Sequence, residues 1–139
     1  MDGVNEACEE KLSPEDRYKY TIHITNVLDE EKGFELFRKY LTKYQRHDGL
    51  QLLNYWENIK KLFERIDNVD YAEYSEDITA LIKEAYKIIG HHVNPAELQQ
   101  FMETYDGIDK EKLKDQLNNL KAQAIDDISG EYELFKKHI

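Results

Sequence analysis

Only two prolines and six glycines interrupt this 139-residue sequence, and they fall where helical segments would begin or end. Between them, apolar residues recur at intervals of three and four, the spacing that places side chains on one face of an α-helix. The longest example is the segment 50–66, in which Leu53, Trp56 and Ile59 share a face. The sequence therefore predicts an all-α fold of about six to eight helices around one core.

Capping residues and turns set the expected helix boundaries in the first half of the chain. Ser13 followed by proline is typical of a helix start, and the helix is expected to run from there to about Leu28. Gly33 is expected to separate it from a second helix over 34–44. A polar turn at 46–49 is then expected to precede the long helix.

The second half of the chain carries similar signals. Ser75 is expected to cap a helix that Gly90 ends. An Asn-Pro pair at 94–95 predicts the start of a short helix, which the Asp-Gly pair at 106–107 terminates. From Asp109 a further apolar stripe predicts a closing helix with an interruption near 129–130.

Length and charge limit the class of protein. A chain of this length supports one domain, and we expect it over 13–139, after a flexible acidic tail at 1–12. The formal charge of −10 disfavours nucleic acid and anionic membrane surfaces as partners. With a single cysteine, Cys8, and no apolar run long enough for a membrane span, a cytoplasmic location is predicted.

No pattern of catalytic or metal-binding residues emerges. Phosphate-binding glycine loops and hydrolase motifs are missing, and no glutamate stands three residues before a histidine, as a helical di-metal site requires. The neighbouring His91 and His92 are expected to be solvated, and nothing beside Cys8 would lower the pKa of its thiol. We expect a protein that is not an enzyme and holds no metal or cofactor.

Tyrosines are frequent in the helical segments and allow two interpretations. They could form an exposed recognition patch, although aromatic residues at helical spacing usually belong to the core. Core packing is the expectation for the following residues: Tyr40, Tyr44, Tyr55, Tyr71 and Tyr74.

The block from Ile24 to Leu62 resembles the first half of a regulator-of-G-protein-signalling (RGS) domain without a gap. Its Gly33-Phe34 pair opens a helix, and an apolar helix ending in Lys60-Lys61 follows a short turn. The resemblance continues with Ala85-Tyr86 through Ile89, Val93-Asn94, Ala122-Gln123 and Tyr132-x-x-Phe135. The family's aromatic-then-cysteine signature is replaced by Leu52-Leu53 and Trp56.

The resemblance implies a two-lobed helical bundle that grips the switch regions of an activated G-protein α subunit and donates no catalytic group. Such a partner accelerates hydrolysis by favouring the transition-state arrangement. Where the family presents an acid followed by an asparagine, this chain has His47, Asp48 and Gly49. Asn94 matches the family, and Glu131 is a shifted substitute for an acid near the end. These five are the candidate partner-binding residues.

Three functions stay open. The first is an RGS-homology module that binds a G-protein α subunit or related signalling partner with weak or no activation of GTP hydrolysis. The second is a working GTPase-activating protein in which His47 or Asp48 replaces the missing amide. The third is an acidic helical adaptor unrelated to G proteins. Nothing in the pattern indicates an oligomeric state.

Overall fold

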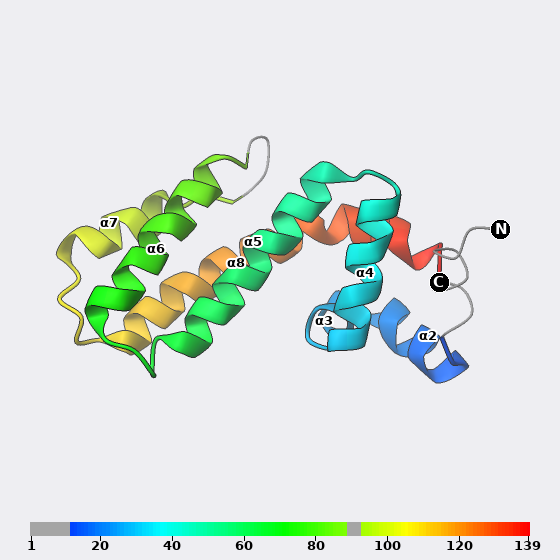
Figure 1. The fold of residues 1–139 in the computed structure, drawn as a ribbon, viewed down its shortest axis with the longest axis horizontal. Helices are drawn as coiled ribbons and strands as arrows, with labels where there is room; N and C mark the ends of the chain where they lie inside the picture. The colour runs from blue at the N-terminus through cyan, green and yellow to red at the C-terminus, as the bar shows by residue number, and fades with distance from the viewer. Residues whose placement is uncertain (1–11, 89–92) are drawn as a thin grey trace. The chain divides into compact units, whose positions relative to one another are not determined.

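The computed structural model describes residues 12–88 and 93–139. Over these residues the chain forms seven α-helices and no β-strand, which confirms the all-α prediction (Figure 1). The helices are α2 (Pro14–Ile22), α3 (Ile24–Leu28), α4 (Glu31–Lys43), α5 (His47–Arg65), α6 (Tyr71–Tyr86), α7 (Ala96–Thr104) and α8 (Lys110–Lys136). None of them is long and apolar enough to cross a membrane.

Some sequence predictions fall outside this part of the chain. They concern Cys8, Gly90, the two histidines at 91–92 and all but the last residue of the predicted tail. That last residue, Leu12, is buried.

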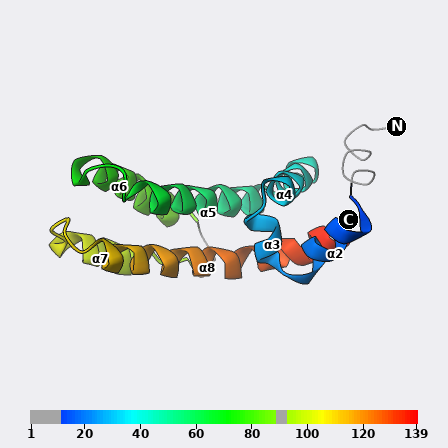
Figure 2. The ribbon, with the colours of Figure 1, turned by 90° about the horizontal axis from the view of Figure 1, so that it is seen from below.

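The helices divide into two compact units. The first unit contains the chain up to Leu50 together with Ile128–Ile139, and the second contains Gln51–Asp127. Because the divisions fall inside α5 and α8, each of these long helices contributes to both units. In the second unit, α5 and α6 form one layer and α7 and α8 the other (Figure 2).

The core of each unit consists of apolar and aromatic side chains at helical spacing. In the first unit Tyr20, Phe37 and Phe135 are among the fully buried side chains, and in the second unit Trp56 and Tyr74 are. Burial of such side chains is the main stabilising contribution to a helical fold.

The tyrosines follow the expected core assignment only in part. Tyr40, Tyr55 and Tyr74 are buried, as predicted, while Tyr44 is 44% exposed and Tyr71 is half-buried.

The expected first helix is broken in two. Its start is confirmed, since the Ser13 hydroxyl accepts a hydrogen bond from the Asp16 N–H at 3.1 Å. The expected continuation to Leu28 is wrong, because His23 has an extended backbone (φ −137°, ψ 136°) that ends α2 and begins α3. No glycine or proline marks this break.

The prediction that Gly33 separates two helices is wrong, because Gly33 lies inside α4. A Cβ atom at this position would lie 2.8 Å from Cε1 of Tyr20 and 3.0 Å from the backbone of Val27. The glycine is therefore needed for the close approach of α4 to the preceding helices, and tertiary packing overrides its low helix propensity.

Three further boundaries differ from expectation. Helix α5 begins at His47, so the turn before it is shorter than 46–49. Asp70 rather than Ser75 caps α6, with its carboxylate accepting from the Glu73 N–H at 3.1 Å. Helix α8 continues through Gly130, where a Cβ atom would meet nothing within 4 Å, because the glycine faces away from neighbouring side chains.

Candidate functional site

Four of the five predicted partner-binding residues gather in the first unit. His47, Asp48 and Gly49 form the first turn of α5, and Glu131 lies near the end of α8. An open depression of about 380 Å³ is lined here by the α4–α5 turn and α8, through Tyr44, Gln45, Arg46, His47, Asp48 and Glu131. We call this depression and its lining the turn site.

The α4–α5 turn is fixed by backbone hydrogen bonds. The Arg46 N–H donates to the Leu41 carbonyl at 2.9 Å, and the Gln45 N–H donates to the Thr42 carbonyl at 3.2 Å. This is the Schellman pattern of helix ends, and it places Gln45 in the left-handed region at φ 55°. The Arg46 carbonyl then accepts from the Leu50 N–H, which starts α5. The position of Arg46 is thus set by both helices.

The Arg46 guanidinium makes a forked ion pair with Glu131. Its Nε lies 3.0 and 3.1 Å from the two carboxylate oxygens, and a terminal nitrogen lies 2.8 Å from Oε1. The hydrogen bond to Glu131 raises the pKa of Arg46, which is always charged in any case. The Glu131 side chain is only 14% exposed, so its side of the ion pair is largely shielded from solvent.

Gly49 lies directly beneath this ion pair and is buried. A Cβ atom at Gly49 would lie 2.7 Å from Oε2 and 3.0 Å from Cγ of Glu131, and 2.9 Å from Cδ2 of Leu41. Real Cβ atoms do not approach other atoms so closely, so a side chain here would displace Glu131. The space that a side chain at position 49 would need is already filled by the Glu131 carboxylate.

His47 and Asp48 are exposed and available. Within the described chain neither side chain makes a hydrogen bond or an ion pair. Asp48 lies in the first turn of α5, where the helix dipole favours a negative charge. Both side chains are therefore free to contact a partner.

An exposed aromatic residue borders the turn site. The Tyr44 ring packs 5.1 Å from the Tyr40 ring and 4.9 Å from the His138 ring, and its hydroxyl lies 3.4 Å from Nδ1 of His138. A partly exposed tyrosine held by neighbouring rings is typical of a residue that anchors a protein interface.

Asn94 lies in the second unit and is engaged there. Its backbone N–H donates to Oε1 of Gln123 at 2.8 Å, and its side-chain oxygen accepts from the Ala96 N–H at 3.1 Å. The helix thus starts directly after the Asn-Pro pair, as predicted, but its N-cap residue is Pro95 rather than Asn94. It does not belong to the turn site.

Arg46 is the residue of the turn site that sequence reasoning missed. Its partner is 85 residues away in the chain, and no local pattern connects the two. Within residues 12–88 and 93–139 no group of three or more His, Cys, Asp or Glu side chains could hold a metal ion. The turn site offers charges, a tyrosine and hydrogen-bonding groups on an open surface, an arrangement suited to binding.

Comparison with protein families, curated proteins and solved structures gives no match to this chain. The resemblance to RGS domains therefore rests on the sequence motifs alone.

Proposed function

We propose that this chain is an RGS-like binding module that contacts a G-protein α subunit through the turn site and gives little or no activation of GTP hydrolysis. It would supply no catalytic group of its own, and we place it in the cytoplasm with its proposed partner. The division into two helical units is compatible with the two-lobed bundle that the resemblance implies.

The observation that carries the proposal is the Arg46–Glu131 pair above Gly49. In the RGS family an asparagine side chain follows the acid of this turn and reaches the GTPase. Here the corresponding glycine has no side chain, and Glu131 occupies the adjacent space. A partner would therefore meet a guanidinium, a tyrosine and two unpaired polar side chains, but no amide from position 49. This supports binding more than activation.

The first test combines pull-down with single-turnover GTP hydrolysis over a panel of purified α subunits. We expect binding of the fluoroaluminate-bound form of at least one α subunit with little stimulation of hydrolysis. The variant Tyr44→Ala with His47→Ala should abolish this binding, since it removes two exposed contacts. The matched control is Lys83→Ala, an exposed residue of α6 outside the turn site. Binding that survives the double substitution would contradict the proposed surface.

A gain-of-function variant tests the role of the ion pair more directly. Gly49→Asn alone should weaken binding because the new side chain collides with Glu131. Gly49→Asn combined with Glu131→Ala makes room for the amide, apart from a shift of the Leu41 methyl. We expect the double variant to stimulate hydrolysis more than the wild-type protein. If the double variant and the wild-type protein stimulate GTP hydrolysis equally, position 49 does not limit activation.

A working GTPase-activating protein is the alternative that the free side chains of His47 and Asp48 favour. In that case the wild-type protein stimulates hydrolysis, and the single substitutions His47→Ala and Asp48→Ala reduce the rate. Failure to bind any α subunit would instead favour an acidic helical adaptor unrelated to G proteins.

A further inference from the structure

Two lysine side chains in the second unit converge on one aromatic ring. The Nζ atoms of Lys60 on α5 and Lys121 on α8 each lie 5.5 Å from the centroid of the Trp56 ring. The two nitrogens are therefore no farther apart than twice this distance. Trp56 is buried, whereas both lysines are half-buried. We call Lys60 and Lys121 the lysine pair, and it shares no residue with the turn site.

The lysine pair has no anionic partner in the described part of the chain. Neither Lys60 nor Lys121 forms an ion pair or a hydrogen bond there. Glu57 and Glu64 lie about one turn from Lys60 on either side, but neither pairs with it, and Glu57 lies 3.8 Å from Lys61 instead. Each ammonium group has three N–H donors, and its contact with an aromatic face supplies no acceptor oxygen for them. The pair can therefore still bind an anion.

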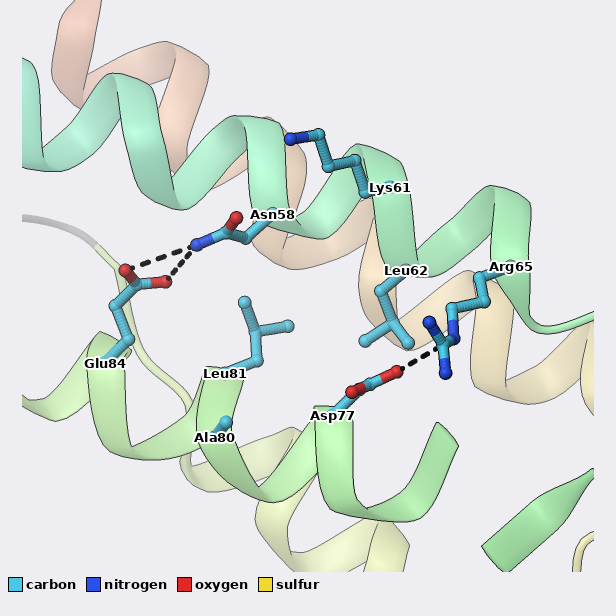
Figure 3. A pocket seen from close by; sticks show the side chains of 8 residues that line it. All are labelled: Asn58, Lys61, Leu62, Arg65, Asp77, Ala80, Leu81 and Glu84. Carbon is cyan, nitrogen blue, oxygen red and sulfur yellow. Dashed lines mark hydrogen bonds and ion pairs between the residues drawn. The ribbon is translucent and has the colours of Figure 1, made fainter. Parts of the chain in front are cut away.

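Two other cations on the same helices differ from the lysine pair in this respect. In the depression between α5 and α6, Nε of Arg65 lies 3.2 Å from Oδ2 of Asp77 (Figure 3). On α8, Nζ of Lys114 lies 2.6 Å from Oδ2 of Asp67. The lysine pair converges without a carboxylate between its members, although the chain has 29 acidic and only 19 basic residues.

The charge and reach of the lysine pair favour a phosphate group as its ligand. Two ammonium groups near each other repel, and a dianion between them offsets this repulsion. At N···O distances of about 2.8 Å, one phosphate can accept hydrogen bonds from two ammonium groups up to roughly 8 Å apart. The flexible stems of lysine can adjust the separation. A carboxylate carries a single charge and would neutralise only half of the pair.

We propose that Lys60 and Lys121 together bind a phosphate dianion, either free or as the monoester of a small molecule. Lysine stems pack along apolar surface and leave the ammonium group in water, where a dissolved anion can reach it. Because only two partly solvated charges contribute, the dissociation constant should lie in the millimolar range. This inference does not depend on the G-protein assignment.

The test uses the fluorescence of Trp56, which is the one tryptophan of the sequence. The full chain is titrated with inorganic phosphate at a pH of about 8, where most of the phosphate is doubly charged. Sodium acetate at equal ionic strength is the reference. We expect a saturable change with phosphate and a weaker change with acetate. The backbone amide NMR signals near Lys60 and Lys121 should shift over the same concentrations. Absence of a saturable change in both measurements overturns the proposal.

Variants that remove one charge locate the site. Lys60→Gln and Lys121→Gln should each weaken phosphate binding about two- to fivefold, and the double variant should abolish saturation. Lys83→Gln is the matched control, because it removes the same charge from an exposed residue of α6. Since the lysine pair also surrounds Trp56, the amide shifts rather than the fluorescence are compared between variants. Equal phosphate affinity of the double variant and the control overturns the proposal.

A phosphoserine peptide distinguishes a small ligand from a phosphorylated protein. The lysine pair would contact only the phosphate group, so we expect a short phosphoserine peptide and inorganic phosphate to bind with similar affinity. The unphosphorylated peptide should not bind. A phosphopeptide affinity more than about tenfold higher would overturn the assignment to a small molecule and place the phosphate on a partner protein.

Discussion

The two helical units differ in how far along the chain their polar contacts reach. In the first unit Arg46 pairs with Glu131 across 85 residues, and the Tyr132 hydroxyl donates to the Tyr20 carbonyl across 112 residues. In the second unit, the contact between Tyr71 and the Tyr105 carbonyl spans 34 residues and that between Lys114 and Asp67 spans 47. The first unit therefore needs both ends of the chain, whereas one continuous segment supplies the second.

This difference bears on the candidate site. The turn site belongs to the first unit, so its geometry depends on the last helical turns of α8 as much as on the α4–α5 turn. The second unit is formed by one continuous segment of the chain, Gln51–Asp127. Changes to the C-terminal segment should therefore affect the turn site and spare the second unit.

Deletion of Ile128–Ile139 should have the largest effect. It removes the buried side chains of Ile128, Tyr132 and Phe135, whose burial contributes more than about 5 kcal/mol together. We expect hydrogen exchange of the α2–α4 amides to become fast while α6 and α7 stay protected. Slow exchange in α2–α4 after the deletion would show that the first unit does not need the C-terminal segment.

Gly107→Ala should be the most damaging single substitution in the second unit. Gly107 has φ +85°, and a Cβ atom would lie 2.1 Å from Cδ2 of Tyr71. Backbone strain and overpacking together should cost about 3 kcal/mol in urea denaturation. The loss of exchange protection should be concentrated near Tyr71 and Tyr105. A variant as stable as the wild-type protein would contradict the tight packing of this turn.

Gly33→Ala gives the corresponding test in the first unit. Contact with Tyr20 and the Val27 backbone should destabilise the protein by about 2 kcal/mol. Gly130→Ala is the matched control, because it also lies within a helix but has open space around it. It should stabilise the protein by about 0.5–1 kcal/mol through helix propensity. Similar results for the two variants would rule out a packing role for Gly33.

Tyr55→Phe should stabilise the second unit by about 1 kcal/mol. The Tyr55 hydroxyl is buried and has no hydrogen-bonding partner in the described part of the chain. Burial of this hydroxyl also raises the pKa of Tyr55. An unsatisfied buried hydroxyl is costly, and phenylalanine removes it without leaving a large cavity. A fall in the thermal midpoint would indicate that the hydroxyl has a partner in solution.

Acid should weaken the first unit through Asp16 and Glu30. The hydrogen bond from Lys32 lowers the pKa of Asp16 below its ordinary 3.8, and that from Lys19 lowers the pKa of Glu30 below its ordinary 4.5. Their contribution is present above these ordinary values and is lost as pH falls through the lowered pKa values. Because both carboxylates are only partly buried and solvent screens their ion pairs, the effect should be the smallest of the series.

Thermal unfolding between pH 7 and pH 2 measures this contribution. The variant Asp16→Asn with Glu30→Gln should lose less stability on acidification than the wild-type protein. Equal pH dependence of the two proteins would show that these pairs do not stabilise the fold.

Local signals predicted the fold well where they acted within one helix. The Ser13 cap, the apolar face of α5 and the start of α7 after Asn94-Pro95 were all recognisable, because caps and periodicity are local properties. The two errors at glycines have a common cause in tertiary packing. Gly33 is accepted inside α4 because of the close approach of Tyr20, and Gly130 because the flanking residues Ile128 and Tyr132 are buried.

The candidate site was less predictable from the sequence. The resemblance selected His47, Asp48, Gly49 and Glu131. In the structure His47, Asp48 and Glu131 line the turn site, and Gly49 lies against the Glu131 side chain. It did not select Arg46, since an ion pair between distant residues leaves no trace in helical periodicity. The interpretation of Gly49 also changes. From the sequence it is a position that lacks the family's side chain, whereas in the structure a side chain there would collide with Glu131.

The tight turn at Gln45 also makes the first unit intolerant of insertions. Only three residues, from Tyr44 to Arg46, join α4 to α5, and Arg46 takes part in the backbone bonding of both helices. One residue added near the start of α5 would rotate everything before it by about 100° relative to the rest of that helix. The guanidinium would then point away from Glu131. We therefore expect homologous chains to have no insertions or deletions in this turn and to have them in other loops.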